Sequence, residues 1–286
     1  MVFRFYRHKN WCKNTPIFVP FLYPPKISAA SAAEVTSHNV VGYSKITLPA
    51  GAMTIVGNQF QYIGNTSIDL QDIKGVSLGE EGSDYIKIWD PLTRTYLTAY
   101  YWGDSMDGVF DDVNNTPENY DDDEALGAGW GDVYQTALHS TIVSGQGFWM
   151  ESAAGGEVMF SGEITTSNTI TLPAGSMTLV CNTSPMAIEL QDIKGISLGE
   201  EGSDYIKIWD SATRTYLTAY YWGDSMDGVF DDVNNTPENY DDDEALGAGW
   251  GDVYQTALHA EIAVGQGFWM ESAAGGEVSF PAVSAE

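Results

Sequence analysis

One long passage of the chain occurs twice. Residues 70–139 recur at 190–259 with an offset of 120 positions. Within this passage three positions differ: Val76/Ile196, Pro91/Ser211 and Leu92/Ala212. The likeness extends upstream, where TLPAGAMTIV from Thr47 matches TLPAGSMTLV from Thr171. A duplication of this length predicts two copies of one fold, and tandem modules more often serve binding or spanning than catalysis.

The repeat divides the chain into three predicted segments. Residues 1–33 form a leader, residues 43–162 a first β-module and residues 167–281 a second one. Each module has about 120 residues, which is enough to bury a core of its own.

Strand signals dominate each module. Aromatic and β-branched residues at 85–89 and 94–102 flank an Asp-Pro turn and predict a hairpin. A second hairpin is predicted from 148–151 and 157–160, and residues 70–73 read as one helical turn. The predicted fold class is all-β, with two tandem β-sandwich or small-barrel modules.

The charge is strongly negative outside the leader. The leader holds five of the chain's 12 basic side chains and no acidic one, so the remainder has 40 acids, seven bases and a net charge of −33. Such a surface repels phosphate backbones and anionic lipid, which argues against nucleic-acid partners. It is compatible with cations, with basic partners, or with a surface that is simply solvated.

The leader resembles a secretory signal peptide. A basic start, the short apolar run at 17–23 and the small residues Ser31 and Ala33 predict cleavage before Glu34. Lys26 and two prolines interrupt the apolar part, so the segment reads as a degraded or mis-started signal. We therefore expect a secreted or cell-surface protein, and no other stretch is long enough to span a membrane as a helix.

An acidic segment in each repeat is the first candidate site. Residues 104–124 hold nine acidic side chains among 21 residues, and the segment recurs at 224–244. Ca²⁺ takes six to eight oxygen ligands and tolerates irregular geometry, so calcium is the predicted cofactor. The alternative is a solvated acidic loop. The candidate metal ligands are Asp104, Asp107, Asp111, Asp112, Asp224, Asp227, Asp231 and Asp232.

Part of this segment resembles a known calcium loop. The spacing of an EF-hand is absent, but DGVFDDVNNTP from Asp107 resembles the loops of thrombospondin type 3 repeats over eleven residues. The resemblance implies Asp107, Asp111 and Asp112 as ligands, with their counterparts in the second repeat. The preceding Asp pair is missing, and Thr116 stands where that family has a cysteine.

Aromatic residues near the acidic segment are the second candidate site. Exposed on one face, they can stack on sugar rings as in carbohydrate-binding modules. The alternative is that they are core residues and cross-strand pairs. The candidate ligand-binding residues are Trp102, Trp130, Trp222 and Trp250.

The sequence gives little support for catalysis or for a disulfide. The four histidines fall outside metal-protease motifs, and no nucleophile elbow, P-loop or dinucleotide fingerprint is present, so no catalytic residue is predicted. Of the two cysteines, Cys12 lies in the leader, and Cys181 stands where the first module has Gly57. Neither belongs to a repeated pair, and Cys181 is expected to pack as a small apolar residue.

The modules resemble a widespread kind of bacterial secreted β-module. The likeness lies in TLPAG from Thr47, Asn58, Ile88-Trp89 and GQGFW from Gly145, and it recurs from Thr171. It implies an exported or cell-surface location without assigned biochemistry. We therefore expect a structural or adhesive protein, calcium-stabilised, whose partner is an extracellular protein or a glycan surface. The alternative is a carbohydrate-binding module, and the oligomeric state stays open.

Overall fold

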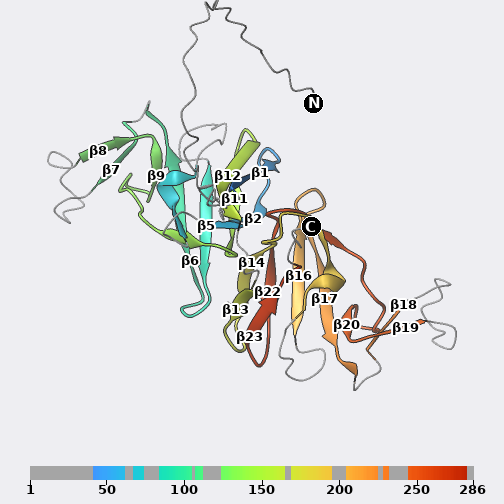
Figure 1. Cartoon of the computed structure of the whole chain (residues 1–286). Coiled ribbons are helices and arrows are strands. Elements are labelled where there is room, and N and C mark those ends of the chain that lie inside the picture. The colour runs from blue at the N-terminus through green and yellow to red at the C-terminus, as the bar shows by residue number, and fades with distance from the viewer. Residues whose placement is uncertain are drawn as a thin grey trace, which may run out of the picture. The chain divides into compact units, whose positions relative to one another are not determined.

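The described part of the protein is built almost entirely from antiparallel strands (Figure 1). The structure is a computed structural model that describes residues 41–61, 67–73, 84–104, 107–111, 124–164, 169–194, 204–224, 228–231 and 244–281. Residues 39–286 form one compact unit. The leader predicted at 1–33 lies outside the described residues.

The first repeat contains a five-stranded sheet, a three-stranded sheet and two small ribbons. The five-stranded sheet has the order β2-β11-β5-β6-β9, the three-stranded sheet has the order β1-β12-β3, and β10-β4 and β7-β8 form the ribbons. The strands are β1 (Val41–Leu48), β2 (Thr54–Gly57), β3 (Phe60–Gln61), β4 (Ser67–Asp69), β5 (Tyr85–Asp90), β6 (Thr95–Trp102), β7 (Val109–Asp111), β8 (Glu124–Gly127), β9 (Gly129–Gly131), β10 (Thr141–Val143), β11 (Gly147–Glu151) and β12 (Gly156–Ile164).

The second repeat reproduces the five-stranded sheet in the order β14-β22-β16-β17-β20. Its strands are β13 (Thr169–Leu172), β14 (Thr178–Cys181), β15 (Ile188–Glu189), β16 (Tyr205–Asp210), β17 (Thr215–Trp222), β18 (Val229–Asp231), β19 (Glu244–Gly247), β20 (Gly249–Gly251), β21 (Glu261–Ile262), β22 (Gly267–Glu271) and β23 (Gly276–Ser279). Here β13 pairs with β23 in a two-stranded sheet, because the shorter second copy has no counterpart of β3 among its described strands.

The predicted all-β class is confirmed, and the sheets of the described residues do not close into a barrel. The predicted helical turn is present as the 3-10 turns η1 (Leu70–Asp72) and η4 (Leu190–Asp192). The described residues contain no helix long and apolar enough to cross a membrane.

One predicted hairpin is confirmed and the other is wrong. β5 and β6 pair around the Asp90–Thr93 turn, with Trp89 opposite Tyr96. By contrast, β11 and β12 do not pair: β11 lies between β2 and β5, and β12 lies between β1 and β3. Both edges of β11 are already occupied by ladder hydrogen bonds, so the chain after Glu151 crosses to the other sheet.

Each repeat encloses its own hydrophobic core between its two sheets. In the first repeat, Ile86, Phe148, Met150 and Val158 are completely buried, and the rings of Phe148 and Phe160 meet edge-on at 6.1 Å between centroids. The second repeat has the matching cluster. This arrangement is sandwich-like, because the inward-facing residues of both sheets supply the core.

A third apolar cluster joins the two repeats. Its buried members are Ile55, Trp149, Leu179 and Trp269. The edge strands β2 and β14 meet here through antiparallel bridges to the opposite repeat, Val56 with Gln266 and Gln146 with Val180. The repeats therefore share apolar side chains and main-chain hydrogen bonds, and their cohesion does not depend on the connecting segment alone.

Candidate functional site

The acidic segment of each repeat starts and ends on a short two-stranded ribbon. β7 and β8 pair so that Asp111 lies opposite Glu124, and β18 and β19 repeat this pairing. Residues 112–123 and 232–243 lie outside the described residues. The predicted ligands Asp112, Asp227 and Asp232 lie there or in the neighbouring gap, also outside the described residues.

Asp104 precedes β7 and binds the backbone at the junction between β8 and β9. Its Oδ1 accepts a hydrogen bond from the backbone N–H of Ala128 at 2.7 Å, and Asp224 does the same with Ala248. The exposed Asp107 has a left-handed φ of 67°, and its N–H donates to the Asp104 carbonyl at 3.3 Å. Asp104 therefore stabilises the protein's own backbone, in a role that the sequence did not predict.

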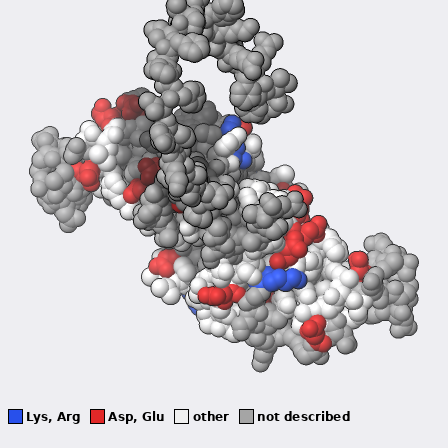
Figure 2. Space-filling model, in the orientation of Figure 1, with Lys and Arg blue, Asp and Glu red and all other residues white. Residues whose placement is uncertain are grey.

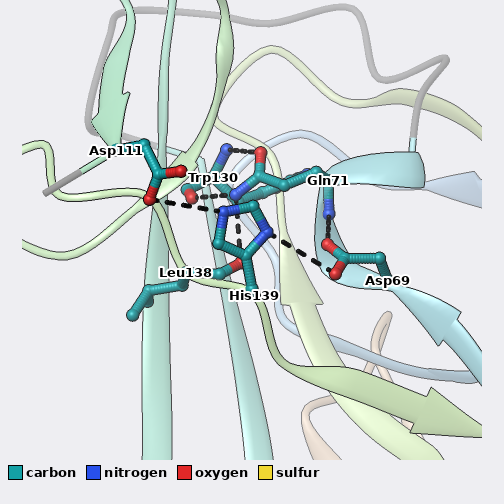
Figure 3. A network of polar contacts seen from close by, with 6 residues as sticks. All are labelled: Asp69, Gln71, Asp111, Trp130, Leu138 and His139. Atoms are coloured by element: carbon teal, nitrogen blue, oxygen red, sulfur yellow. Dashed lines mark hydrogen bonds and ion pairs between the residues drawn. The ribbon is translucent and has the colours of Figure 1, made fainter. Parts of the chain in front are cut away.

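His139 lies between two carboxylates from different strands (Figure 3). Its Nδ1 is 3.6 Å from Asp69 on β4, and its Nε2 is 3.9 Å from the predicted ligand Asp111 on β7. In the second repeat, His259 lies between Glu189 and Asp231 at 3.9 and 3.6 Å. These side chains are about half exposed, so the pairing is one between solvated groups and contributes little to stability.

The partly buried Gln71 belongs to the same network (Figure 3). Its Nε2 donates to the carbonyls of Trp130 and Leu138 at 2.5 and 3.0 Å, and its Oε1 accepts from the Trp130 N–H at 2.9 Å. The backbone N–H of Gln71 donates to the Asp69 carboxylate at 2.8 Å. One amide side chain thus ties the helical turn to β9 and to the segment that carries His139.

The described part of the acidic segment does not assemble a metal cage. Among the described residues, no group of three His, Cys, Asp or Glu side chains can hold a metal ion. Asp104 is bonded to backbone and Asp111 faces His139, while the two His139 nitrogens face different carboxylates.

The structure corrects half of the predicted aromatic platform. Trp130 and Trp250 are 1% and 0% exposed, so a sugar ring cannot stack on them. Trp130 lies in the first core, where its Nε1 donates to the Ile73 carbonyl at 3.1 Å. Trp102 and Trp222 are partly buried, and each indole donates at 2.9 Å to a main-chain oxygen, of Asp132 and Asp252 respectively. The sequence of a strand shows where aromatic residues lie, but it does not show which face of the sheet packs against the core.

A groove between the repeats is a site that the sequence did not indicate. It has a volume of about 580 Å³ and lies between strands β1 and β2 of the first repeat and the β16–β17 hairpin of the second. Lys45, Thr54, Trp209 and Asp210 line it. The Thr54 hydroxyl is buried and has no hydrogen-bond partner among the described residues. A smaller groove of about 440 Å³ lies beside the equivalent Trp89.

Most polar groups of the larger groove are already bonded. Lys45 pairs with Glu157 at 2.6 Å, the Asp210 carboxylate accepts from Ala212 and Thr213, and the Trp209 indole donates to Met53 at 2.7 Å. Hydrogen bonding to Thr213 lowers the pKa of Asp210, which keeps that carboxylate charged. The groove therefore offers the partly exposed Trp209 indole ring beside the charged groups of Lys45 and Asp210.

Comparisons of the chain with family models, with curated proteins and with solved structures find no match.

Proposed function

We propose that the protein is a secreted or surface-attached, non-enzymatic structural or adhesive element that bridges extracellular protein or glycan surfaces. The observation that carries this proposal is the locking of two near-identical repeats into one unit. Figure 1 shows the β7–β8 and β18–β19 ribbons far from the strands β2 and β14, where the repeats meet. A compact unit that presents the same acidic sequence twice suits bivalent attachment, because the second contact becomes intramolecular.

Charge supports an extracellular partner that is cationic or is linked through cations. Figure 2 shows Asp and Glu on the visible face in clear excess over Lys and Arg. Each acidic segment adds nine acidic side chains within 21 residues. A bound Ca²⁺ neutralises part of this repulsion, and a ligand that binds only the folded protein raises its melting temperature.

The calcium part is tested on the full chain after removal of metal with EDTA. Calorimetry is expected to show binding heat on addition of Ca²⁺, and millimolar Ca²⁺ is expected to raise the melting temperature. Asp107→Asn with Asp112→Asn should abolish binding in the first repeat, and Asp227→Asn with Asp232→Asn in the second. Asp90→Asn is the matched control, since it removes an exposed carboxylate outside the segment. Absence of heat and of any thermal shift in the unmodified chain would remove calcium from the proposal.

The bridging part needs its own measurement. Beads coated with the protein are expected to bind to the surface of the producing cell, and soluble full chain at low concentration should link two such surfaces. A variant with the paired Asn substitutions in only one repeat should still bind one surface but should no longer link two. Equal linking by the one-repeat variant and by the unmodified chain would contradict a bivalent role.

Carbohydrate binding is the second candidate function, and the groove between the repeats favours it. Trp209 and the partly exposed Leu217 line the side that the second repeat forms, and Thr54 lies on the side that the first repeat forms. Affinity electrophoresis in polysaccharide gels is the test. Thr54→Val and Trp209→Phe are expected to reduce retention, whereas Thr98→Val on β6 should not. Unretarded migration of the unmodified chain in all gels would eliminate this function.

A further inference from the structure

The contacts between the two repeats occur in reciprocal pairs. The N–H of Gly57 donates to the Gly265 carbonyl at 3.0 Å, and the N–H of the equivalent Cys181 donates to the equivalent Gly145 at 2.9 Å. The indoles of Trp89 and Trp209 likewise donate to Met177 and Met53 at 2.7 Å. An interface in which each contact between residues i and j is matched by a contact between their equivalents is isologous, and it has an approximate two-fold rotation axis.

The axis passes close to position 57 of the first repeat and position 181 of the second. A Cβ atom placed on Gly57 would lie 2.2 Å from the Cβ of Cys181 and 2.6 Å from its Sγ. Atoms this close overlap, so the two equivalent positions cannot both carry a side chain. Cys181 itself is fully buried, and its thiol lies 3.4 Å from the Asn58 carbonyl in the first repeat.

Many residues along this interface are the same in both repeats, although Ile55 of the buried cluster corresponds to Leu179. Trp89/Trp209, Trp149/Trp269, Met53/Met177 and Gly145/Gly265 are the same residue in both copies. Sequence alone would therefore allow the interface face of either repeat to pair with a copy of itself. The difference between Gly57 and Cys181 breaks this equivalence at the point where the two faces come closest.

We propose that the interface is a selective docking surface, in which the face of the first repeat fits the face of the second repeat and rejects a like face. If the faces of two second repeats docked together, two Cys181 side chains would overlap. If the faces of two first repeats docked together, two glycines would meet and leave a void where the Cys181 thiol now packs. Packing loss and steric overlap both destabilise a protein interior. The matching partner of each face is thus the unlike repeat of this chain.

The experiment moves one methyl group across the axis in the full chain. Four variants form a cycle: Cys181→Ala; Gly57→Ala with Cys181→Gly; Gly57→Ala with Cys181→Ala; and Cys181→Gly alone. The double-alanine chain reproduces the centre of a second-with-second pair, and Cys181→Gly reproduces that of a first-with-first pair. Thermal unfolding of each variant is followed by calorimetry, with Cys12→Ser as a common background.

One side chain at the axis should be tolerated from either repeat. The two single-alanine arrangements are expected to melt within about 2 °C of each other, and the double-alanine chain about 5 °C or more below both. The Cys181→Gly chain should also melt below them. The proposal would be overturned if the changes in melting temperature at positions 57 and 181 were additive. It would also be overturned if Gly57→Ala with Cys181→Gly melted as low as the double-alanine chain. If the double-alanine chain does not fold at all while both single arrangements do, the proposal holds.

Discussion

The indole N–H of Trp89 donates to the main-chain oxygen of Met177 at 2.7 Å, across the boundary between the repeats. The same ring packs edge-on against Trp269 of the second repeat, with 5.6 Å between centroids. Both contacts require the second repeat to be in place, and Trp209 makes the reciprocal pair with Met53 and Trp149. The cohesion of the repeats therefore rests on a few directional contacts as well as on buried area.

Trp89→Phe and Trp209→Phe should loosen the repeats from each other. Each variant loses one hydrogen bond and part of a partly buried ring, and we expect the free energy of unfolding to fall by about 2 kcal/mol. Burial raises the pKa of the Cys181 thiol, so that thiol reacts with a disulfide reagent only when the interface opens. Labelling kinetics in a Cys12→Ser background should therefore accelerate in both variants.

Trp102→Phe is the control for the labelling experiment. Trp102 makes a comparable indole bond at 2.9 Å, but to Asp132 within its own repeat. It should lower stability without changing the rate at which Cys181 is labelled below the melting transition. Faster labelling in Trp102→Phe than in Trp89→Phe would show that the thiol reports something other than separation of the repeats.

Removing the Gln71 side chain should cost more than its partial exposure suggests. Gln71→Ala leaves the Trp130 N–H and the carbonyls of Trp130 and Leu138 without their side-chain partner. We expect a loss of about 1–3 kcal/mol in urea unfolding, and a similar loss for Gln191→Ala. Asp72→Ala, in the same helical turn but exposed, should change stability by less than about 0.5 kcal/mol. Equal effects of Gln71→Ala and Asp72→Ala would contradict the structural role of the amide.

The Tyr85–Glu151 pair predicts a loss of stability at high pH. Burial and the hydrogen bond that Tyr85 donates to Glu151 raise the pKa of the Tyr85 hydroxyl, and Tyr205 with Glu271 repeats this. Because the folded-state pKa lies above the unfolded value, the unfolded chain releases these protons first. The stabilisation is complete below about pH 10 and declines as pH rises beyond it.

Urea unfolding at a series of alkaline pH values measures this decline. The double variant Tyr85→Phe with Tyr205→Phe should show a shallower fall in unfolding free energy above about pH 10 than the unmodified chain. Tyr43→Phe, at a tyrosine that is 76% exposed, is the control and should leave the slope unchanged. A double variant with the slope of the unmodified chain would refute the contribution of these two hydroxyls.

Gly108 is required for the ribbon that carries the acidic segment. Its φ is +74°, and an added Cβ would lie 2.1 Å from the carbonyl oxygen of Gly127. Gly108→Ala should therefore lower the unfolding free energy by more than about 2 kcal/mol through strain and overlap. Gly51→Ala is the matched control: it has a similar φ of +60° but open space around the added methyl group, so it should cost about 1 kcal/mol. Equal losses in denaturant unfolding would show that overlap with Gly127 is absent.

Local patterns were enough to predict strands and one turn type. Residues 85–89 and 94–102 are rich in aromatic and β-branched residues on both sides of an Asp-Pro turn, and the strands there pair as predicted. The helical turn predicted at 70–73 is the 3-10 turn Leu70–Asp72. These features depend on residues that are neighbours in sequence, so the sequence carries them directly.

Contacts between distant segments were not predictable in this way. The sequence does not distinguish Trp130 from Trp102, yet Trp130 is buried in the core and Trp102 is only partly buried. His139, in the segment before β10, lies between Asp69 on β4 and Asp111 on β7, and these residues are far apart in the chain, so no motif spacing predicted the contact.

The amino-acid sequence by itself determined the duplication, the all-β class and the excess of negative charge, since repetition, strand period and composition are properties of a linear string. Only the tertiary structure decided that the β11 and β12 segments separate into two sheets, and that Gly57 and Cys181 meet at an axis between the repeats. The physical reason is that sheet partners and interface contacts are chosen by competition among edges and surfaces. Which edges and surfaces pair depends on packing in three dimensions, and local residue patterns do not encode it.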